Sequence, residues 1–392
     1  MKAVTITRTG GPEVLEVRNY PDPRPAEGEL TIKVAAAGVN FADILARKGL
    51  YPDGPKFPAV VGYEVAGEVL QVGKSAAGKV RRKTGKSGDS DDSAKIGDSI
   101  ESGNSDDSAK SGGSADSVSD SGSESSSPSS RFKPGDRVLA LTRFNGYSEI
   151  VTVPEEQVFP IPDTLSYPEA AAIPVNYLTA WQLAEMGGLK RGDTLLIHNA
   201  GGGVGLAALE IARHLGARTL GTASPWKHER LLERGLDVAI DYRRGDWVKA
   251  VLHHTGGRGA DVIFDPLGGA SWKQSWRALR PTGRLGMFGV SVVTTSNLPG
   301  ALRYVPMLQR MPFYTPVQLM NSNKGVYGVN IGRLWSEKDK AKEWAEAILA
   351  GVKKGWVRPH VDAIFTYEEA PVAHTFIEER KNFGKVVLTP DK

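Results

Sequence analysis

Hydrophobic and polar positions alternate with a period of two along residues 1–73 of the chain. The alternation runs through 1–7, 29–36 and 61–72, and it returns at 147–153. This pattern is typical of strands that bury one face. We therefore predict a β-rich first domain.

From residue 194 onwards, short apolar runs alternate with stretches of helical period. The apolar runs are too short for helices and lie at 194–198, 218–223, 238–241, 260–265 and 283–289. Further stretches have helical spacing, at 169–174, 179–187, 206–215, 227–234 and 339–350. Strands and helices in alternation predict an α/β fold with a doubly wound parallel sheet. The tail, 357–388, is expected to return to the first domain.

The segment 74–131 interrupts both patterns, because Ser, Gly, Asp and Lys dominate it and it contains no aromatic residue. Such a segment cannot bury enough apolar surface to offset the entropy of ordering it. Residues 85–87 resemble the end of a Walker A loop, but Val80 occupies the position where that motif requires its first glycine. Its Asp-rich repeats at 89–95 and 104–110 lack the glycine and glutamate of a calcium loop. We predict a disordered low-complexity insertion; a phosphorylated or partner-binding segment is the alternative.

Composition excludes several kinds of site. The chain has no cysteine, which excludes disulfides, thiolate nucleophiles and zinc sites that depend on Cys. A net charge of +4 over 392 residues gives no indication of a nucleic-acid partner. No apolar run approaches the length of a spanning helix, about 20 residues. We expect no integral membrane segment and a cytoplasmic location.

A glycine-rich turn follows the apolar run at 194–198. It consists of Ala200, Gly201, Gly202, Gly203, Val204 and Gly205, and a helical stretch comes directly after it. Strand, glycine turn and helix form the context of a dinucleotide-binding fingerprint. The glycines let backbone N–H groups approach a pyrophosphate, and the helix N-terminus adds partial positive charge. Ala200 occupies the place of the first fingerprint glycine, so some other glycine-rich turn of an α/β protein is the alternative.

The end of the second strand indicates which dinucleotide binds. NAD-specific sites carry an Asp or Glu there that accepts the ribose hydroxyls. Here the strand leads into Ser224 and then Lys227, with no acidic residue. Both side chains could donate hydrogen bonds to a 2′-phosphate, although Lys227 could also be a solvated helix-start residue. NADPH is favoured over NADH.

Taken together, several stretches resemble the zinc-independent quinone oxidoreductases (zeta-crystallin-like) of the medium-chain dehydrogenase/reductase superfamily. They are GVNFADILARKGLYP (38–52), VVGYEVAGEV (60–69), FKPGDRV (132–138), NYLTAWQL (176–183), HNAGGGVGLAALEIARHLGA (198–217), GADVIFDPLGG (259–269) and GKVVL (384–388). The stretch 323–335 is similar to the vesicle amine transport protein branch. The resemblance covers the chain outside 74–131, where relatives have a short turn.

The resemblance implies three parts. Residues 1–167 would form a GroES-like catalytic domain that carries the insertion, 168–335 an NADPH-binding Rossmann domain, and 336–392 a return to the catalytic domain. It also implies a homodimer formed by pairing of Rossmann sheet edges.

The resemblance further implies roles for individual residues. Asn40 and Tyr51 match positions beside nicotinamide and substrate, and they are the candidate catalytic residues. Further positions match cofactor contacts: Thr179, Tyr242, Gly268, Phe288, Gly289 and Lys385. Asn40 could instead cap its own turn, Tyr51 could be a packed loop aromatic, and Thr179 could cap a helix start.

The two motifs that hold zinc in related alcohol dehydrogenases contain Val39-Asn40 and Gly62-Tyr63-Glu64 here, so no metal is expected. Without a Lewis acid, hydride transfer requires an acceptor that is already electrophilic. We predict an NADPH-dependent reductase of quinones or α,β-unsaturated carbonyl compounds. The alternatives are an enoyl-thioester reductase and a non-catalytic NADPH-binding interaction protein.

Overall fold

The computed structural model describes residues 1–51, 54–73, 130–295, 298 and 300–390. The chain divides into two units, 1–74 with 130–392, and 75–129. The predicted disordered insertion at 74–131 lies outside the described residues apart from Ser130 and Arg131. The fold below is that of the first unit.

Two sheets form the β-rich part of the molecule. The small one has the order β2-β1-β4, with β1 Lys2–Ile6, β2 Leu15–Asn19 and β4 Ala59–Val60. The large one has seven strands in the order β15-β16-β3-β5-β6-β8, with β7 paired to β3. Its strands are β3 Glu29–Val39, β5 Glu64–Val72, β6 Arg137–Leu141, β7 Ile150–Pro154, β8 Val158–Pro160, β15 Val361–Thr366 and β16 Lys385–Thr389. The predicted strands at 1–7, 29–36, 61–72 and 147–153 are therefore confirmed.

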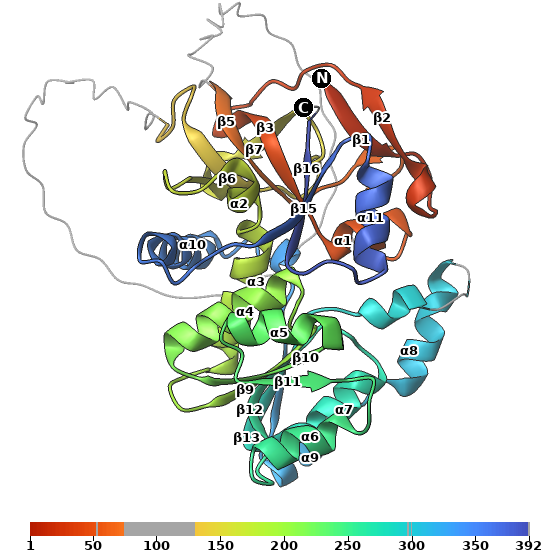
Figure 1. Cartoon of the computed structure of the whole chain (residues 1–392). Coiled ribbons are helices and arrows are strands. Elements are labelled where there is room, and N and C mark those ends of the chain that lie inside the picture. Colours follow the sequence, from red (N-terminus) through yellow and green to blue (C-terminus); the bar gives the residue numbers. More distant parts are fainter. Residues whose placement is uncertain (52–53, 74–129, 296–297, 299, 391–392) are drawn as a thin grey trace, which may run out of the picture. The chain divides into compact units, whose positions relative to one another are not determined.

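The C-terminal part of the chain contributes two strands to this large sheet. β16 runs antiparallel to β3 and places Val387 opposite Gly38. β15 continues the sheet by pairing in parallel with β16. Residues near the two ends of the sequence, around 38 and 385, are thus neighbours in the sheet (Figure 1).

The second half of the fold is a six-stranded sheet in the order β11-β10-β9-β12-β13-β14. All its pairs are parallel. The strands are β9 Thr194–His198, β10 Arg218–Ala223, β11 Val238–Asp241, β12 Ala260–Asp265, β13 Leu279–Met287 and β14 Gly325–Gly328. From β9 the chain first adds β10 and β11 on one side of the sheet and then β12, β13 and β14 on the other. This strand order is that of the doubly wound Rossmann fold. The predicted fold class is confirmed.

Helices cover both faces of the parallel sheet (Figure 1). Successive side chains of β9 show this, because Leu195 and Ile197 pack in one hydrophobic cluster and Leu196 in another. The first cluster includes residues of α3 Pro174–Gly187, α4 Gly203–Leu215 and α10 Lys338–Lys353. The second includes residues of α6 Trp247–His254 and α7 Ala270–Ala278. A strand buried on both faces explains the continuous apolar run in the sequence.

The other helices are short. The α-helices are α1 Phe41–Arg47, α2 Tyr167–Ala171, α5 His228–Glu233, α8 Val305–Arg310, α9 Pro316–Ser322 and α11 Ala370–Glu378. The 3₁₀ turns are η1 Pro12–Val14, η2 Glu155–Gln157, η3 Pro225–Lys227, η4 Ser291–Thr295, η5 Gly300–Tyr304 and η6 Ile331–Arg333. The helix predicted at 179–187 starts earlier, at Pro174, because proline suits the first helical position. Thr179 therefore lies inside a helix, and the alternative that it caps a helix start is wrong.

Candidate active site

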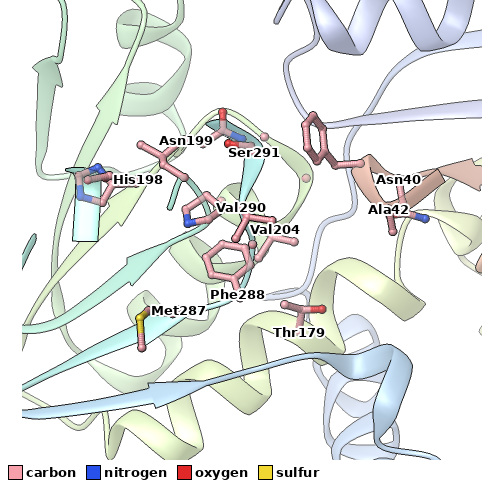
Figure 2. Close-up of a pocket in the computed structure, with 18 of the residues that line it drawn as sticks. Asn40, Ala42, Thr179, His198, Asn199, Val204, Met287, Phe288, Val290 and Ser291 are labelled. Carbon is pink, nitrogen blue, oxygen red and sulfur yellow. The ribbon is translucent and has the colours of Figure 1, made fainter. Parts of the chain in front are cut away.

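A cavity of about 1800 Å³ opens at the carboxyl edge of the parallel sheet. Its walls combine residues of that sheet with residues of β3, α1 and β16. Figure 2 shows Asn40 and Ala42 on one side and His198 and Asn199 on the other. Ligands of open α/β sheets bind at this edge, where the strand order reverses.

Most of the predicted site residues line this cavity. They are Asn40, Tyr51, Thr179, Gly202, Gly203, Val204, Gly205, Ser224, Lys227, Tyr242, Phe288, Gly289 and Lys385. Ala200, Gly201 and Gly268 are not part of the wall. Ala200 is fully buried beneath the turn, close to Gly221 of β10. Gly268 has a φ of +90°, which favours glycine, in the turn after β12.

The glycine turn is built so that backbone fills its interior. Gly202 is the N-cap of α4, and a Cβ on Gly205 would lie 2.5 Å from the carbonyl oxygens of Asn199 and Ala200. A Cβ on Gly203 would lie 2.5 Å from Nδ2 of Asn176. At Gly205 the backbone itself therefore excludes a side chain, whereas at Gly203 the Asn176 amide would have to move to admit one. Backbone N–H groups at the start of a thirteen-residue helix then face the cavity, where they can hold a phosphate.

A group of cationic and hydroxyl side chains follows β10 and β11. Ser224, Lys227 and Tyr242 meet here, as predicted, and Arg380 joins them from the loop after α11. Nη1 of Arg380 donates to the Tyr242 hydroxyl at 3.3 Å. Burial alone would raise the pKa of Tyr242, but hydrogen bonds from Ser224 and Arg380, together with the Arg380 charge, lower it. Anionic groups are favoured at this point of the wall.

Lys227 is anchored within this group. Its Nζ donates to the carbonyl oxygen of Asn382 at 2.5 Å, and only 4 % of the residue is exposed. Burial lowers the pKa of Lys227 to about 8, against the opposing effect of Asp362. The alternative of a solvated helix-start lysine is therefore wrong. The carboxylate of Asp246 also lines the cavity, but it accepts the N–H groups of Val248 and Lys249 as the N-cap of α6.

At the other end of the cavity, Asn40 forms a closed set of contacts with Glu64 and Lys385. Nζ of Lys385 forms an ion pair with Oε1 of Glu64 and donates to Oδ1 of Asn40 at 2.7 Å. Nδ2 of Asn40 donates to the same Oε1 at 2.8 Å and to the carbonyl oxygen of Gly38 at 3.2 Å. Asn40 is thus held by long-range contacts as well as by its own turn. Both amide hydrogens have acceptors, so Asn40 has no spare donor for a substrate oxygen.

The carboxylate of Asp43 holds the backbone at Asn40 by a hydrogen bond. This carboxylate accepts the N–H of Asn40 at 2.8 Å, the N–H of Gly62 at 3.0 Å and the hydroxyl of Tyr147 at 2.8 Å. Burial raises the pKa of Asp43 to about 7 although these hydrogen bonds and Lys385 oppose the shift. The contacts fix the entry of α1 and with it the position of Asn40.

Aromatic and apolar side chains line the cavity around this polar set. The ring of Tyr51 meets the ring of Tyr63 edge to face at 5.8 Å. The hydroxyl of Tyr51 has no hydrogen-bond partner among the described residues, which distinguishes it from Asn40. Other apolar members of the wall are Phe41, Leu45, Leu50, Leu141, Val290, Ile331 and Trp335. This end of the cavity suits an apolar ligand with one polar group.

His198 is a cavity residue that the sequence did not single out. Its Nδ1 lies 2.9 Å from Oγ1 of Thr222 and its Nε2 lies 3.0 Å from Oγ of Ser275. Burial lowers the pKa of His198 although the nearby Asp265 opposes the shift. Both imidazole nitrogens are occupied, so its role is to support the end of β9.

Neither a metal centre nor a spanning helix is found in the described part of the chain. No group of three or more His, Asp or Glu side chains there could hold a metal ion. The described helices are all too short or too polar to cross a bilayer.

Comparisons with known proteins agree with this architecture. The family described as alcohol dehydrogenase GroES-like domain matches residues 26–104, and the family described as zinc-binding dehydrogenase matches 234–388. The chain is 32 % identical to the human synaptic vesicle membrane protein VAT-1 homolog, covering all of this chain and 86 % of the relative. It is 30 % identical to a quinone oxidoreductase of Pseudomonas aeruginosa, over 99 % of both chains.

Solved structures give the same result. The human VAT-1 homolog-like protein superposes with a TM-score of 0.75 at 27 % identity, covering 100 % of this chain and 98 % of that one. A mycobacterial protein solved as a complex with NADPH superposes with a TM-score of 0.76 at 27 % identity over the full length of both chains.

Proposed function

Because this chain belongs to the medium-chain dehydrogenase/reductase superfamily of oxidoreductases, in its quinone oxidoreductase-like branch, we propose that it reduces quinones or α,β-unsaturated carbonyl compounds with NADPH. One observation carries the proposal. A single cavity joins a phosphate-binding glycine turn and a cationic group to an apolar end that has one free phenol.

The choice of NADPH rests on the residues after β10 and β11. A 2′-phosphate placed there would meet Lys227, Arg380 and the hydroxyls of Ser224 and Tyr242. Charge-assisted hydrogen bonds of this kind are about twice as strong as neutral ones. Two carboxylates line the cavity among the described residues: Asp246 caps α6 through Oδ1, and Glu378 pairs with Arg47 and Lys48. Neither directly follows β10, where NAD-specific sites carry their acidic residue. The mycobacterial relative in complex with NADPH supports the same choice.

When bound, NADPH supplies a hydride from C4 of its nicotinamide ring. The remaining tasks fall to the chain. The glycine turn and α4 would hold the pyrophosphate, and the helix that carries Thr179 would contribute to the wall beside the ring. Asn40 has a lone pair of Oδ1 left and can accept a hydrogen bond there, whereas its NH₂ group is engaged. Tyr51 is the group that donates to the oxygen of the acceptor as negative charge develops.

The reaction proceeds without zinc in this proposal. The two motifs that hold zinc in related alcohol dehydrogenases contain Val39-Asn40 and Gly62-Tyr63-Glu64 here. Next to them, Lys385 brings a fixed ammonium group into contact with Asn40. Zinc sites in proteins are built from Cys, His and carboxylate side chains, whereas here an ammonium group lies against the Asn40 amide.

The test is an activity assay with purified protein. NADPH oxidation should accelerate on addition of an ortho-quinone or a conjugated aldehyde, and dialysis against a chelator should leave the rate unchanged. Turnover of a crotonyl thioester alone would favour an enoyl-thioester reductase instead. NADPH binding with no turnover of any of these acceptors would contradict a catalytic role and favour an NADPH-binding interaction protein.

A further inference from the structure

A buried ion pair lies at the cavity wall, with Lys385 among the lining residues and Glu64 behind it, and the proposed reaction assigns it no direct step. Glu64 is 0 % exposed and Lys385 is 3 % exposed. Breaking a buried pair destabilises a protein, but replacing both charges by neutral groups is often harmless or stabilising. A gain in stability is therefore a poor explanation for this pair.

The pair contacts both ends of one side chain, the amide of Asn40. The ammonium of Lys385 meets Oδ1, and the carboxylate of Glu64 accepts from Nδ2. Turning the amide by 180° would place NH₂ against the ammonium and oxygen against the carboxylate. Both new contacts would be repulsive in a dry site. The pair therefore fixes the amide in one orientation.

The three groups are also packed closely against the backbone of β3. A Cβ on Gly38 would lie 2.5 Å from Oε1 of Glu64 and 2.6 Å from Cε of Lys385. Glycine at this position lets the pair approach the strand that leads into Asn40.

Each partner is further tied to an element of the cofactor half. Oε2 of Glu64 accepts the N–H of Val175, at the start of α3, at 2.7 Å. The residue before Lys385, Gly384, donates its N–H to the carbonyl oxygen of Gly201 at 3.0 Å. The pair thus joins Asn40 to the glycine turn and to the helix that carries Thr179.

We propose that Glu64 and Lys385 are positioning residues that hold the Asn40 amide in a single orientation at the nicotinamide end of the cavity. The inference rests on the proposed function. Glu64 acts through Asn40, and the two charges together fix the orientation of the amide relative to the glycine turn. Displacement of a positioned group by about 1 Å costs about 100-fold in rate.

The test is the double variant Glu64→Gln with Lys385→Met, which leaves no uncompensated buried charge. We expect kcat at saturating NADPH to fall about 10- to 100-fold. A loss that appears only as a larger dissociation constant for NADPH, measured by fluorescence titration, would make Lys385 a direct cofactor contact and overturn the positioning role. The matched control is Asp261→Asn with Arg280→Met, which removes an ion pair of 2.6 Å between β12 and β13, outside the cavity wall. The control should keep the kcat of the wild type. A double variant at Glu64 and Lys385 with wild-type kcat would overturn the proposal.

A second readout does not depend on turnover. In crystal structures of the two proteins, Asn40 should have one conformation in the wild type and several, or a reversed amide, in the double variant. An unchanged Asn40 in a folded double variant would overturn the positioning role. If the wild type binds NADPH but reduces no acceptor, the proposed function fails while this structural comparison still decides the orientation of Asn40.

Discussion

At the scale of single residues, the candidate site separates into groups that are engaged and groups that are free. Asn40, His198 and Asp43 use their polar atoms in contacts within the protein. Tyr51 keeps an unengaged hydroxyl at the apolar end of the cavity, so it is the residue to which we assign the donor role.

Replacing Tyr51 by Phe tests that role. The change removes only the hydroxyl, so the apolar wall stays intact. We expect kcat with a quinone to fall about 10- to 100-fold because one preorganised donor to the developing negative charge is lost. Steady-state kinetics measure the effect. An unchanged kcat would assign protonation to solvent alone.

Lys227 and Arg380 should determine the preference for NADPH. Replacing either by Met removes a charged donor from the 2′-phosphate position, worth about 1.5–3 kcal/mol. The KM for NADPH should rise about tenfold or more, whereas the KM for NADH should change little. The ratio of kcat/KM for the two cofactors is the measurement. Equal losses with NADPH and NADH would place the phosphate elsewhere.

The pKa of Lys227, about 8, predicts a pH dependence of cofactor binding. Below pH 8 the side chain is charged and attracts the 2′-phosphate, and above pH 8 it becomes neutral in the free protein. NADPH affinity should therefore decline as pH rises through 8, and NADH affinity should not. Lys227→Arg keeps the charge, so titrations with this variant should show a flatter profile.

At the scale of elements, the turn between β9 and α4 was predictable because its information is local. The apolar run, the glycines and the helical period follow one another in the sequence, and each has the predicted structure. Arg380 and Glu64 were not identified as site residues, because contacts with residues far along the chain, Tyr242 and Lys385, define their places in the site. Arg380 meets Tyr242 from 138 residues away. The orientation of the Asn40 amide depends on Lys385, which is 345 residues away.

Gly205→Ala should damage this turn. Its Cβ would lie 2.5 Å from two backbone oxygens, which no side-chain rotation can relieve. We expect a loss of about 1–3 kcal/mol in the free energy of unfolding and a large loss of NADPH affinity. Chemical denaturation and fluorescence titration measure the two effects. The control is Gly135→Ala, in another turn. A Cβ on Gly135 would meet nothing within 4 Å, but φ is +90° there, so this variant shows the cost of backbone strain without steric crowding.

At the scale of the whole molecule, the place of the insertion explains how the fold accommodates it. β5 and β6 are antiparallel neighbours, and Glu68 lies opposite Arg137. Beyond the paired strands, the N–H of Gly135 donates to the carbonyl oxygen of Val69 at 2.8 Å. The chain leaves and re-enters the first unit at adjacent strand ends, which a short turn could join.

Deleting residues 75–130 and closing the gap with a short turn should therefore preserve function. Lengthening a surface loop costs little closure entropy, so removing the segment should change kcat and KM for NADPH less than about twofold. Kinetics of the deletion variant measure this. A large loss would give the insertion a direct role in activity.

Sheet-edge pairing is expected to make the protein a homodimer. β14, Gly325–Gly328, ends the parallel sheet on one side, so its outer edge can pair with that of a second copy. Light scattering coupled to size exclusion should give twice the chain mass. A replacement of Val326 by Pro should shift the mass toward that of the monomer, since proline cannot donate to a strand ladder.

The distance along the chain between Asn40 and Lys385 also has a consequence for biosynthesis. While the ribosome is still translating the parallel-sheet half, the nascent chain already contains Asn40 and Glu64 but not the strand that brings Lys385. The carboxylate of Glu64 then lacks its cation, and β3 lacks its neighbour β16. The set of contacts around Asn40 is complete only after translation has passed residue 389, so no shorter nascent chain contains the whole candidate site.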